Sequence, residues 1–136
     1  MNSNPKCPTC GVAIDDHEAT PCLDTWIAQL MDWQFDIGGG SVPSEWLAPD
    51  GKTRSFLPPK YATEDGAANQ VVDHILALSN EWGVHRLVEY ATTVKEGRRV
   101  HSCFHIRGLG FGADGPTRPL AIVRAGVAAL VMKEEK

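Results

Sequence analysis

Residues 6–26 read KCPTCGVAIDDHEATPCLDTW, and this stretch leads directly into the first predicted helix. It contains three cysteines and one histidine at the spacing Cys-x2-Cys-x6-His-x4-Cys. The four residues are Cys7, Cys10, His17 and Cys22. Three thiolates and one imidazole form the closed tetrahedral ligand set that is typical of structural zinc. The pattern therefore predicts a structural zinc site in an N-terminal segment that spans residues 1–21.

The local sequence supports these ligand positions. Gly11 directly follows Cys10, and its permissive backbone allows a turn in which backbone N–H groups point at the two sulfur atoms of the CPTC segment. Thr20 and Pro21 are typical of a helix N-cap and a first helical residue, which places Cys22 in the first turn. The free N–H groups of that turn and the helix dipole favour a thiolate.

Three other interpretations of the cysteines are a disulfide, a redox Cys-x-x-Cys motif and buried thiols without a ligand. Residues 1–6 form no apolar signal segment, which argues against an oxidising compartment. A thioredoxin-type motif follows a strand, whereas this motif lies in a polar segment. The fourth ligand could be Asp15, Asp16 or Glu18 instead of His17, because these acidic residues lie beside it in the sequence. A catalytic metal is disfavoured because four protein ligands leave no position for water.

The composition limits the size and the partners of the protein. The 136 residues, of which 43% are hydrophobic, are sufficient for one domain at residues 22–136 and a small N-terminal appendage. A net charge of −4 argues against a general nucleic-acid-binding surface. No apolar run reaches the length of a membrane span, so we expect a soluble protein with no membrane partner. Four cysteines without a secretory signal fit a reducing cytoplasm.

Periodicity and turn signals predict an α+β fold with a mainly antiparallel sheet. The expected order is helix, two strands, helix, two strands, helix. The ranges are a helix at 22–35, strands at 46–47 and 54–57, a helix at 63–80, strands at 84–94 and 100–107, a glycine-rich loop at 108–119 and a helix at 120–132. In the strand at 100–107, alternate residues should face opposite ways. Val100, Ser102, Phe104 and Ile106 form the apolar face, and His101, Cys103, His105 and Arg107 form the other.

The polar face of this strand suggests an anion-binding pocket, provided that the fold brings other basic residues and the glycine-rich loop to it. A phosphate-bearing ligand would fit such a pocket. The candidate ligand-binding residues are Arg98, Arg99, His101, His105, Arg107, Gly110, Arg118, Arg124 and Trp46. The alternative is that the arginines are ordinary surface charges and the histidines are half-exposed strand residues.

Two further motifs give weaker signals. Residues 108–113 match the dinucleotide fingerprint G-x-G-x-x-A, but the preceding strand belongs to a hairpin and no acidic residue follows in a second strand. We therefore expect a flexible binding loop there. Cys103 beside His101 or His105 could act as a nucleophile with a base, but no acidic residue is available to orient the histidine. An inert thiol is the expectation, and the sequence contains no recognisable catalytic set.

Four segments resemble the phage ABA sandwich domain, a family of small bacteriophage proteins. They are CLDTWIA at 22–28, WLAP at 46–49, YATED at 61–65 and PLAIVRA at 119–125. The resemblance extends over most of residues 22–131 and implies a three-layer helix, sheet, helix sandwich. It also implies a phage or prophage origin and action in the cytoplasm of an infected bacterium, without an established activity.

These observations predict a non-enzymatic phage protein that sequesters a phosphate-bearing, nucleotide-type ligand or a host defence component. One alternative is an adaptor that contacts another protein through its zinc segment and an exposed sheet face. A weaker alternative is a nucleotide-processing enzyme that uses His101 or His105. A symmetric homodimer is a reasonable expectation for a small sandwich domain, although no residue in the sequence specifies it.

Overall fold

The computed structural model describes residues 5–41, 44–78, 85–94, 97–106 and 109–134. In these residues it shows three α-helices and two three-stranded antiparallel sheets. The helices are α1 (Pro21–Leu30), α2 (Asp65–Leu76) and α4 (Arg118–Glu134), and a short 3-10 helix, η1, covers Ile14–Asp16. The strands are β1 (Gln34–Asp36), β2 (Glu45–Leu47), β3 (Arg54–Ser55), β4 (His85–Val94), β5 (Gly97–Ile106) and β6 (Leu109–Gly115). The α+β class and the antiparallel pairing are confirmed.

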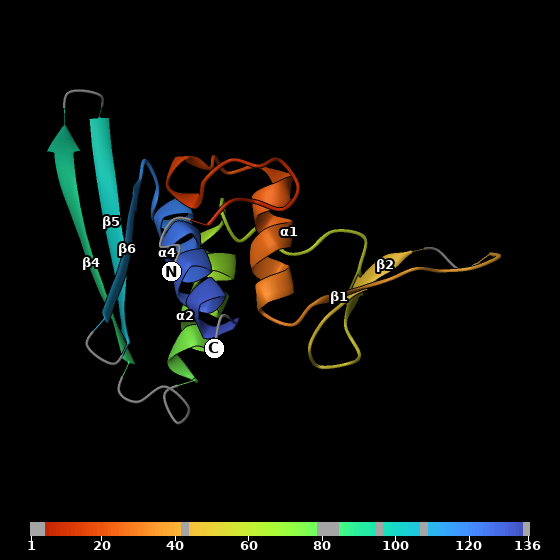
Figure 1. Ribbon diagram of the computed structural model, residues 1–136. Helices are drawn as coiled ribbons and strands as arrows, with labels where there is room; N and C mark the ends of the chain where they lie inside the picture. Colours follow the sequence, from red (N-terminus) through yellow and green to blue (C-terminus); the bar gives the residue numbers. More distant parts are fainter. Residues whose placement is uncertain (1–4, 42–43, 79–84, 95–96, 107–108, 135–136) are drawn as a thin grey trace.

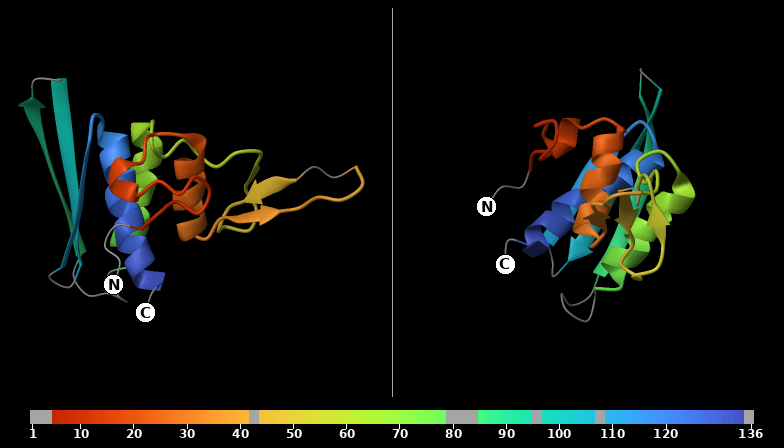
Figure 2. Two further views of the ribbon diagram at one scale, coloured as in Figure 1. Left: turned by 45° about the horizontal axis from the view of Figure 1, so that its top comes forward. Right: turned by 90° about the vertical axis from the view of Figure 1, so that its right-hand side faces the viewer.

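The two sheets lie on opposite sides of the helices. Figure 1 shows α2 and α4 beside the β4–β5–β6 sheet, with α1 beyond them. The β1–β2–β3 sheet projects away from the helices on the far side, as the left view of Figure 2 also shows. We call residues 34–41 and 44–57, which carry this small sheet, the arm. The three-layer arrangement implied by the resemblance stays a prediction.

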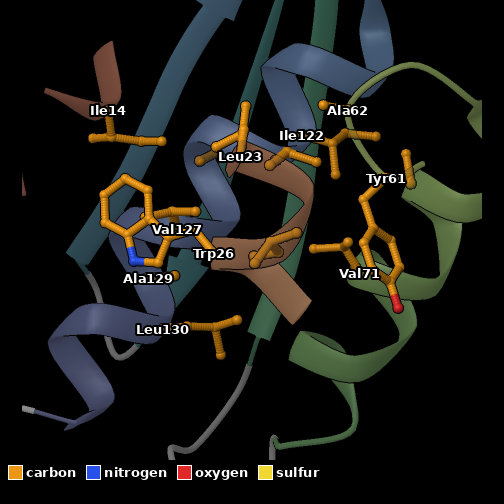
Figure 3. Packing of buried hydrophobic residues seen from close by; sticks show 14 of the residues in the cluster. Ile14, Leu23, Trp26, Tyr61, Ala62, Val71, Ile122, Val127, Ala129 and Leu130 are labelled. Carbon is orange, nitrogen blue, oxygen red and sulfur yellow. The ribbon is translucent and has the colours of Figure 1, made fainter. Parts of the chain in front are cut away.

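Helix α4 lies at the centre of the core. Most of its residues from Leu120 to Leu130 are apolar and fully buried, as expected of a helix that has neighbours on several sides. It contacts β5 and β6 on one side and α1 and α2 on another. Figure 3 shows α4 residues such as Ile122 and Val127 meeting Leu23 and Trp26 of α1 and Val71 of α2. This helix therefore connects the sheet to the N-terminal part of the chain.

The first helix is shorter than predicted. It ends at Leu30, whereas the sequence pattern continued it to residue 35. The helix stops because Asp32 adopts a left-handed conformation with φ of 72°. The backbone N–H groups of Asp32 and Trp33 then donate to the carbonyls of Gln29 and Ala28, which is a Schellman cap. The cap turns the chain sharply, and residues 34–36 form β1 instead.

The glycine-rich loop predicted at 108–119 is wrong, because residues 109–115 form β6. This strand pairs with β5 in antiparallel register, with Gly110 opposite His105 and Gly112 opposite Cys103. A Cβ atom at Gly112 would lie 3.1 Å from the His101 ring and 3.4 Å from the Cys103 sulfur. The β5 side chains thus lie over the bare backbone of β6. Glycine here makes room inside a sheet and does not form a phosphate-binding or flexible loop.

The predicted alternation along β5 is confirmed. Val100, Ser102, Phe104 and Ile106 are buried, and His101, Cys103 and His105 are partly exposed. The hairpin of β4 and β5 is also confirmed, since His85 pairs with Ile106 and Val94 pairs with Gly97. Arg107 lies outside the described residues.

Candidate metal centre

The four predicted zinc ligands lie together. The sulfur atoms of Cys7, Cys10 and Cys22 and one ring nitrogen of His17 are all within 4.8 Å of one another. His17 Nε2 lies 3.3 Å from the Cys10 sulfur and 3.4 Å from the Cys22 sulfur. Zinc–sulfur bonds of about 2.3 Å in a tetrahedron separate two sulfur atoms by roughly 3.8 Å. The cluster therefore has the donor set and the dimensions of a metal site.

A hydrogen bond orients the imidazole of His17 toward the sulfur atoms. Its Nδ1 lies 2.8 Å from the backbone carbonyl oxygen of Glu18, which can only accept. The Nδ1–H therefore donates to this carbonyl, and the lone pair of Nε2 is available to a metal ion. This arrangement fixes the tautomer that a metal-binding histidine requires.

The surroundings of the cysteines also suit metal ligands. A hydrogen bond from the backbone N–H of Val12 is the main factor that lowers the pKa of the Cys10 thiol. Burial raises the pKa of Cys22, and a hydrogen bond with the Thr20 hydroxyl, at 3.2 Å from its sulfur, opposes this rise. Gly11 has a φ of 77°, and its N–H donates to the carbonyl of Cys7. The turn expected from the CPTCG sequence is thus present, and of the two expected N–H···S contacts the one to the Cys10 sulfur is present.

The metal cluster is attached to the body of the protein and does not form a separate tail. We call residues 5–22, which carry the four ligands, the knuckle. Ile14 of the knuckle is completely buried, and Figure 3 shows it beside Trp26 and Leu23. The guanidinium of Arg124 on α4 donates to the backbone carbonyl of His17 at 2.8 Å and to that of Asp114 at 2.7 Å. Arg124 therefore connects the knuckle to the end of β6.

The disulfide interpretation of the cysteines does not describe this structure, whereas the redox motif and the unliganded thiols stay alternatives. Cys7, Cys10, Cys22 and Cys103 are all free cysteines. The acidic substitutes for His17 do not join the cluster, and the described residues contain no second group of three or more such ligands. A Cys3His set closes the coordination of a tetrahedral metal, which is the arrangement of structural sites. The cysteine cluster is thus compatible with a structural metal.

Three of the predicted basic residues lie together at the end of the sheet near the knuckle. Arg99, His101 and Arg124 line a hollow of about 270 Å³, which we call the basic hollow. His101 stacks on Tyr90 with 4.8 Å between ring centroids, so its position is fixed. Asp15 and Asp114 line the same hollow, and they offset part of its positive charge.

Asp114 is the site residue that the sequence did not reveal. Its carboxylate contacts Nδ1 of His101 directly across the β5–β6 pair and lies 4.0 Å from the Arg99 guanidinium. A carboxylate on Nδ1 holds an imidazole with Nε2 free, as in catalytic dyads. The pairing of Asp114 with His101 could not be predicted, because residue 114 was expected to lie in a loop, where no neighbour could be assigned to it.

The remaining candidate residues lie elsewhere. His105 and Gly110 face each other further along the sheet, and four residues of extended strand separate His105 from His101 by roughly 13 Å. Arg98 lies in β5 opposite Thr93. Arg118 forms ion pairs with Glu89 at 2.9 Å and with Asp65 at 3.2 Å. Trp46 is in β2 of the arm, where it packs against Phe35.

Comparisons with known proteins identify no relative. The chain matches no protein-family model, no curated protein and no solved structure at a significant level. Among the described residues, no helix combines the length and the apolar character needed to cross a membrane. The site must therefore be interpreted from its own chemistry.

Proposed function

We propose that the protein is a non-enzymatic interaction module, stabilised by structural zinc, that binds another protein through the arm. The observation that carries the proposal is that the arm, within and beside its small sheet, holds four of the exposed large apolar side chains of the described residues. Phe35, Ile37, Phe56 and Leu57 are 50%, 77%, 68% and 65% exposed. Exposed large apolar side chains gathered on one part of a protein mark an interaction site more often than an ordinary surface.

The shape of the arm supports this role. It projects from the body on the side away from the β4–β5–β6 sheet (Figure 2). Phe35 pairs with Trp46 across β1 and β2, and their rings pack edge to face at 5.3 Å. Ile37, two residues after Phe35 in the chain, is also exposed. A protein partner can therefore reach the arm without displacing the core.

Zinc is the metal that fits the cluster best. Thiolates select soft or borderline ions, and a tetrahedral set of three sulfurs and one nitrogen is typical of Zn²⁺. With four protein ligands the metal would hold the knuckle against α1 and α4 and would leave no position for a reacting water. Its role would be stability, and the arm would carry the binding.

The arm proposal is tested with the double variant Phe56→Ser, Leu57→Ser. We expect it to weaken binding of the partner at least tenfold, because central apolar contacts dominate interface energies. The tagged protein is used to recover the partner from a bacterial lysate, and the purified partner is then titrated by calorimetry. Leu109→Ser is the control, because Leu109 is also exposed but lies on β6. Equal loss of affinity in both variants would contradict the proposal, as would no loss in either.

A second candidate function is the sequestration of a phosphate-bearing ligand in the basic hollow. The specific observation in its favour is that Arg99, His101 and Arg124 line one hollow. A phage origin and action in the host cytoplasm, which the resemblance to the phage ABA sandwich domain implies, would suit an anti-defence role for such a ligand-binding protein. Against this candidate, Asp114 already contacts His101, and both hydrogen bonds of Arg124 are made to the protein backbone. An anion would have to compete with these contacts.

Arg99→Gln tests the phosphate candidate. If an anion binds in the basic hollow, the variant should weaken ATP binding about three- to tenfold, because a hydrogen-bonded charge is lost. Lys52→Gln is the matched control, since Lys52 is an exposed cation on the arm. Binding is measured by calorimetry at low salt. ATP returned unchanged after denaturation separates sequestration from an enzyme that uses His101 with Asp114, which would return product.

A further inference from the structure

A cleft of about 400 Å³ lies where the base of the arm meets the end of α1 and the middle of α2. Apolar residues on three chain segments line it, including Met31, Trp33, Pro59 and Tyr61. The polar residues that line it include Asp50 at the tight turn between β2 and β3, and Gln70 and His74 on α2. A mainly apolar hollow with a few convergent polar groups is the usual form of a binding site.

The cleft is shaped by the features that end α1. The Schellman cap at Asp32 turns Trp33 back toward Tyr61, and the Trp33 indole N–H donates to the Tyr61 hydroxyl at 3.0 Å. The hydrogen bond fixes the two aromatic side chains relative to each other. Because the indole N–H is already used, Trp33 offers a ligand its ring and no donor.

Asp50 gives the cleft a negative charge. Its carboxylate accepts hydrogen bonds from the backbone N–H groups of Lys52 and Thr53, at 2.7 and 2.8 Å, and from the Thr53 hydroxyl at 2.7 Å. These hydrogen bonds lower the pKa of the Asp50 carboxyl, and the bond from the Thr53 hydroxyl contributes most. Asp50 is therefore ionised at neutral pH. A carboxylate offers about four acceptor positions, so one position is left for a ligand.

The charges around the cleft select the sign of the ligand. None of the described residues that line it is lysine or arginine. A phosphate or another anion in the cleft would therefore meet the Asp50 carboxylate and no lysine or arginine of its lining, because Arg54 and Lys60 line only the adjoining hollow beyond Trp33 and Pro59. A cation would meet the Asp50 carboxylate and the ring of Trp33, which attracts positive charge through its π system. An apolar stem on the same ligand would lie along Met31 and Pro59.

The cleft continues toward the arm. Past Trp33 and Pro59 it adjoins a second hollow of about 550 Å³, which also borders the exposed side chain of Leu57. A segment that places one side chain in the cleft would thus place its neighbours beside the apolar surface of the arm. We propose that the cleft binds a lysine or arginine side chain of the partner protein, from a segment whose flanking residues are apolar. This inference rests on the proposed function of the arm and names the chemistry of the partner.

The test uses two short peptides as probes, acetyl-Leu-Lys-Leu-amide and its norleucine counterpart acetyl-Leu-norleucine-Leu-amide. Each is titrated into the zinc-loaded protein while the Trp33 indole resonance is followed by NMR. We expect the lysine peptide to shift this resonance and to bind about three- to tenfold more tightly than the uncharged peptide. Equal binding of the two peptides, no shift with either, or a comparable shift with inorganic phosphate would overturn the inference.

Asp50→Asn removes the charge and keeps an oxygen that can accept the bonds of the turn. It should weaken binding of the lysine peptide about two- to fivefold and leave the norleucine peptide unaffected. Asp73→Asn is the control, because Asp73 is exposed on α2 but does not line the cleft. Equal effects of the two variants would also overturn the inference.

The inference and the proposed function can fail separately. If the arm variant loses the partner but the lysine peptide does not shift Trp33, the arm binds a partner and the cleft assignment is wrong. If the arm variant keeps the partner while the lysine peptide still requires Asp50, the cleft binds a cation and the role of the arm is wrong. If the arm variant keeps the partner and the lysine peptide does not shift the Trp33 resonance, both the proposed function and the inference are overturned.

Discussion

Replacing Cys7 with serine is expected to abolish zinc binding and to release the knuckle from the body of the protein. A serine hydroxyl is a poor zinc ligand, and three remaining ligands hold the ion far less tightly. If free zinc exceeds its dissociation constant a thousandfold, the lost stabilisation is about 4 kcal/mol. Native mass spectrometry with and without a chelator measures the metal content, and thermal unfolding measures the stability.

Two comparisons make this result specific to the metal. Cys103→Ser should keep the full zinc content, because Cys103 lies in β5 outside the cluster. Cys7 is itself buried, so a serine there would also lose apolar contacts. The wild-type protein treated with chelator isolates the contribution of the metal, and it should unfold close to the Cys7→Ser variant. A wild-type mass without zinc, or zinc retained in Cys7→Ser, would show that the cluster is not a zinc site.

The metal cluster could be predicted from the sequence because its geometry is local. All four ligands fall within residues 7–22, and the turn at Gly11 and the start of α1 at Pro21 position them. Even the Thr20 hydroxyl that contacts the Cys22 sulfur lies only two residues away. The carbonyl partner of Arg124 could not be foreseen, since that contact joins residues 17 and 124.

The fold was predictable where hydrophobic periodicity is strong and was not where unusual residues carry the structure. Helices usually end at glycine, but Asp32 takes the left-handed position at the end of α1, so the sequence showed no stop before residue 38. Glycines usually indicate loops, but Gly110 and Gly112 lie in β6 beneath the side chains of β5. At Asp32 a residue other than glycine takes the left-handed conformation, and at Gly110 and Gly112 pairing with β5 places glycines inside a strand.

The positions of the basic residues in the sequence did not show which of them are available to a ligand. Their number suggested one anion site, but Arg118 is neutralised by Glu89 and Asp65, which are 29 and 53 residues away in the chain. Arg124 is partly buried and bonded to two carbonyl oxygens. Whether an arginine is available to a ligand depends on such tertiary partners. The cleft at Trp33 was missed for the same reason, because its walls come from α1, the arm and α2.

Replacing Gly126 with valine is expected to destabilise the protein by separating the helices at their crossing. A Cβ atom at this position would lie 3.0 Å from Val71 Cγ1 and 3.4 Å from Ile75 Cδ1 on α2. It would also lie 3.6 Å from Ile27 Cδ1 on α1. Overpacking of a tight core typically costs about 1–3 kcal/mol, and valine adds two methyl groups beyond the Cβ. Urea unfolding monitored by circular dichroism measures the difference.

Two alanine variants show whether the close approach of the helices is the cause. Gly66→Ala, near the start of α2, meets nothing within 4 Å and should stabilise the protein by about 0.5–1 kcal/mol through helix propensity. Gly126→Ala gains the same propensity, but the 3.0 Å contact with Val71 should cancel much of it. The expected order of stability is therefore Gly66→Ala, wild type or Gly126→Ala, and then Gly126→Val. A Gly126→Val protein as stable as Gly66→Ala would mean that α4 does not cross α1 and α2 at this residue. A decrease confined to Gly126→Val would instead show that the missing side chain at position 126 sets how closely the three helices pack.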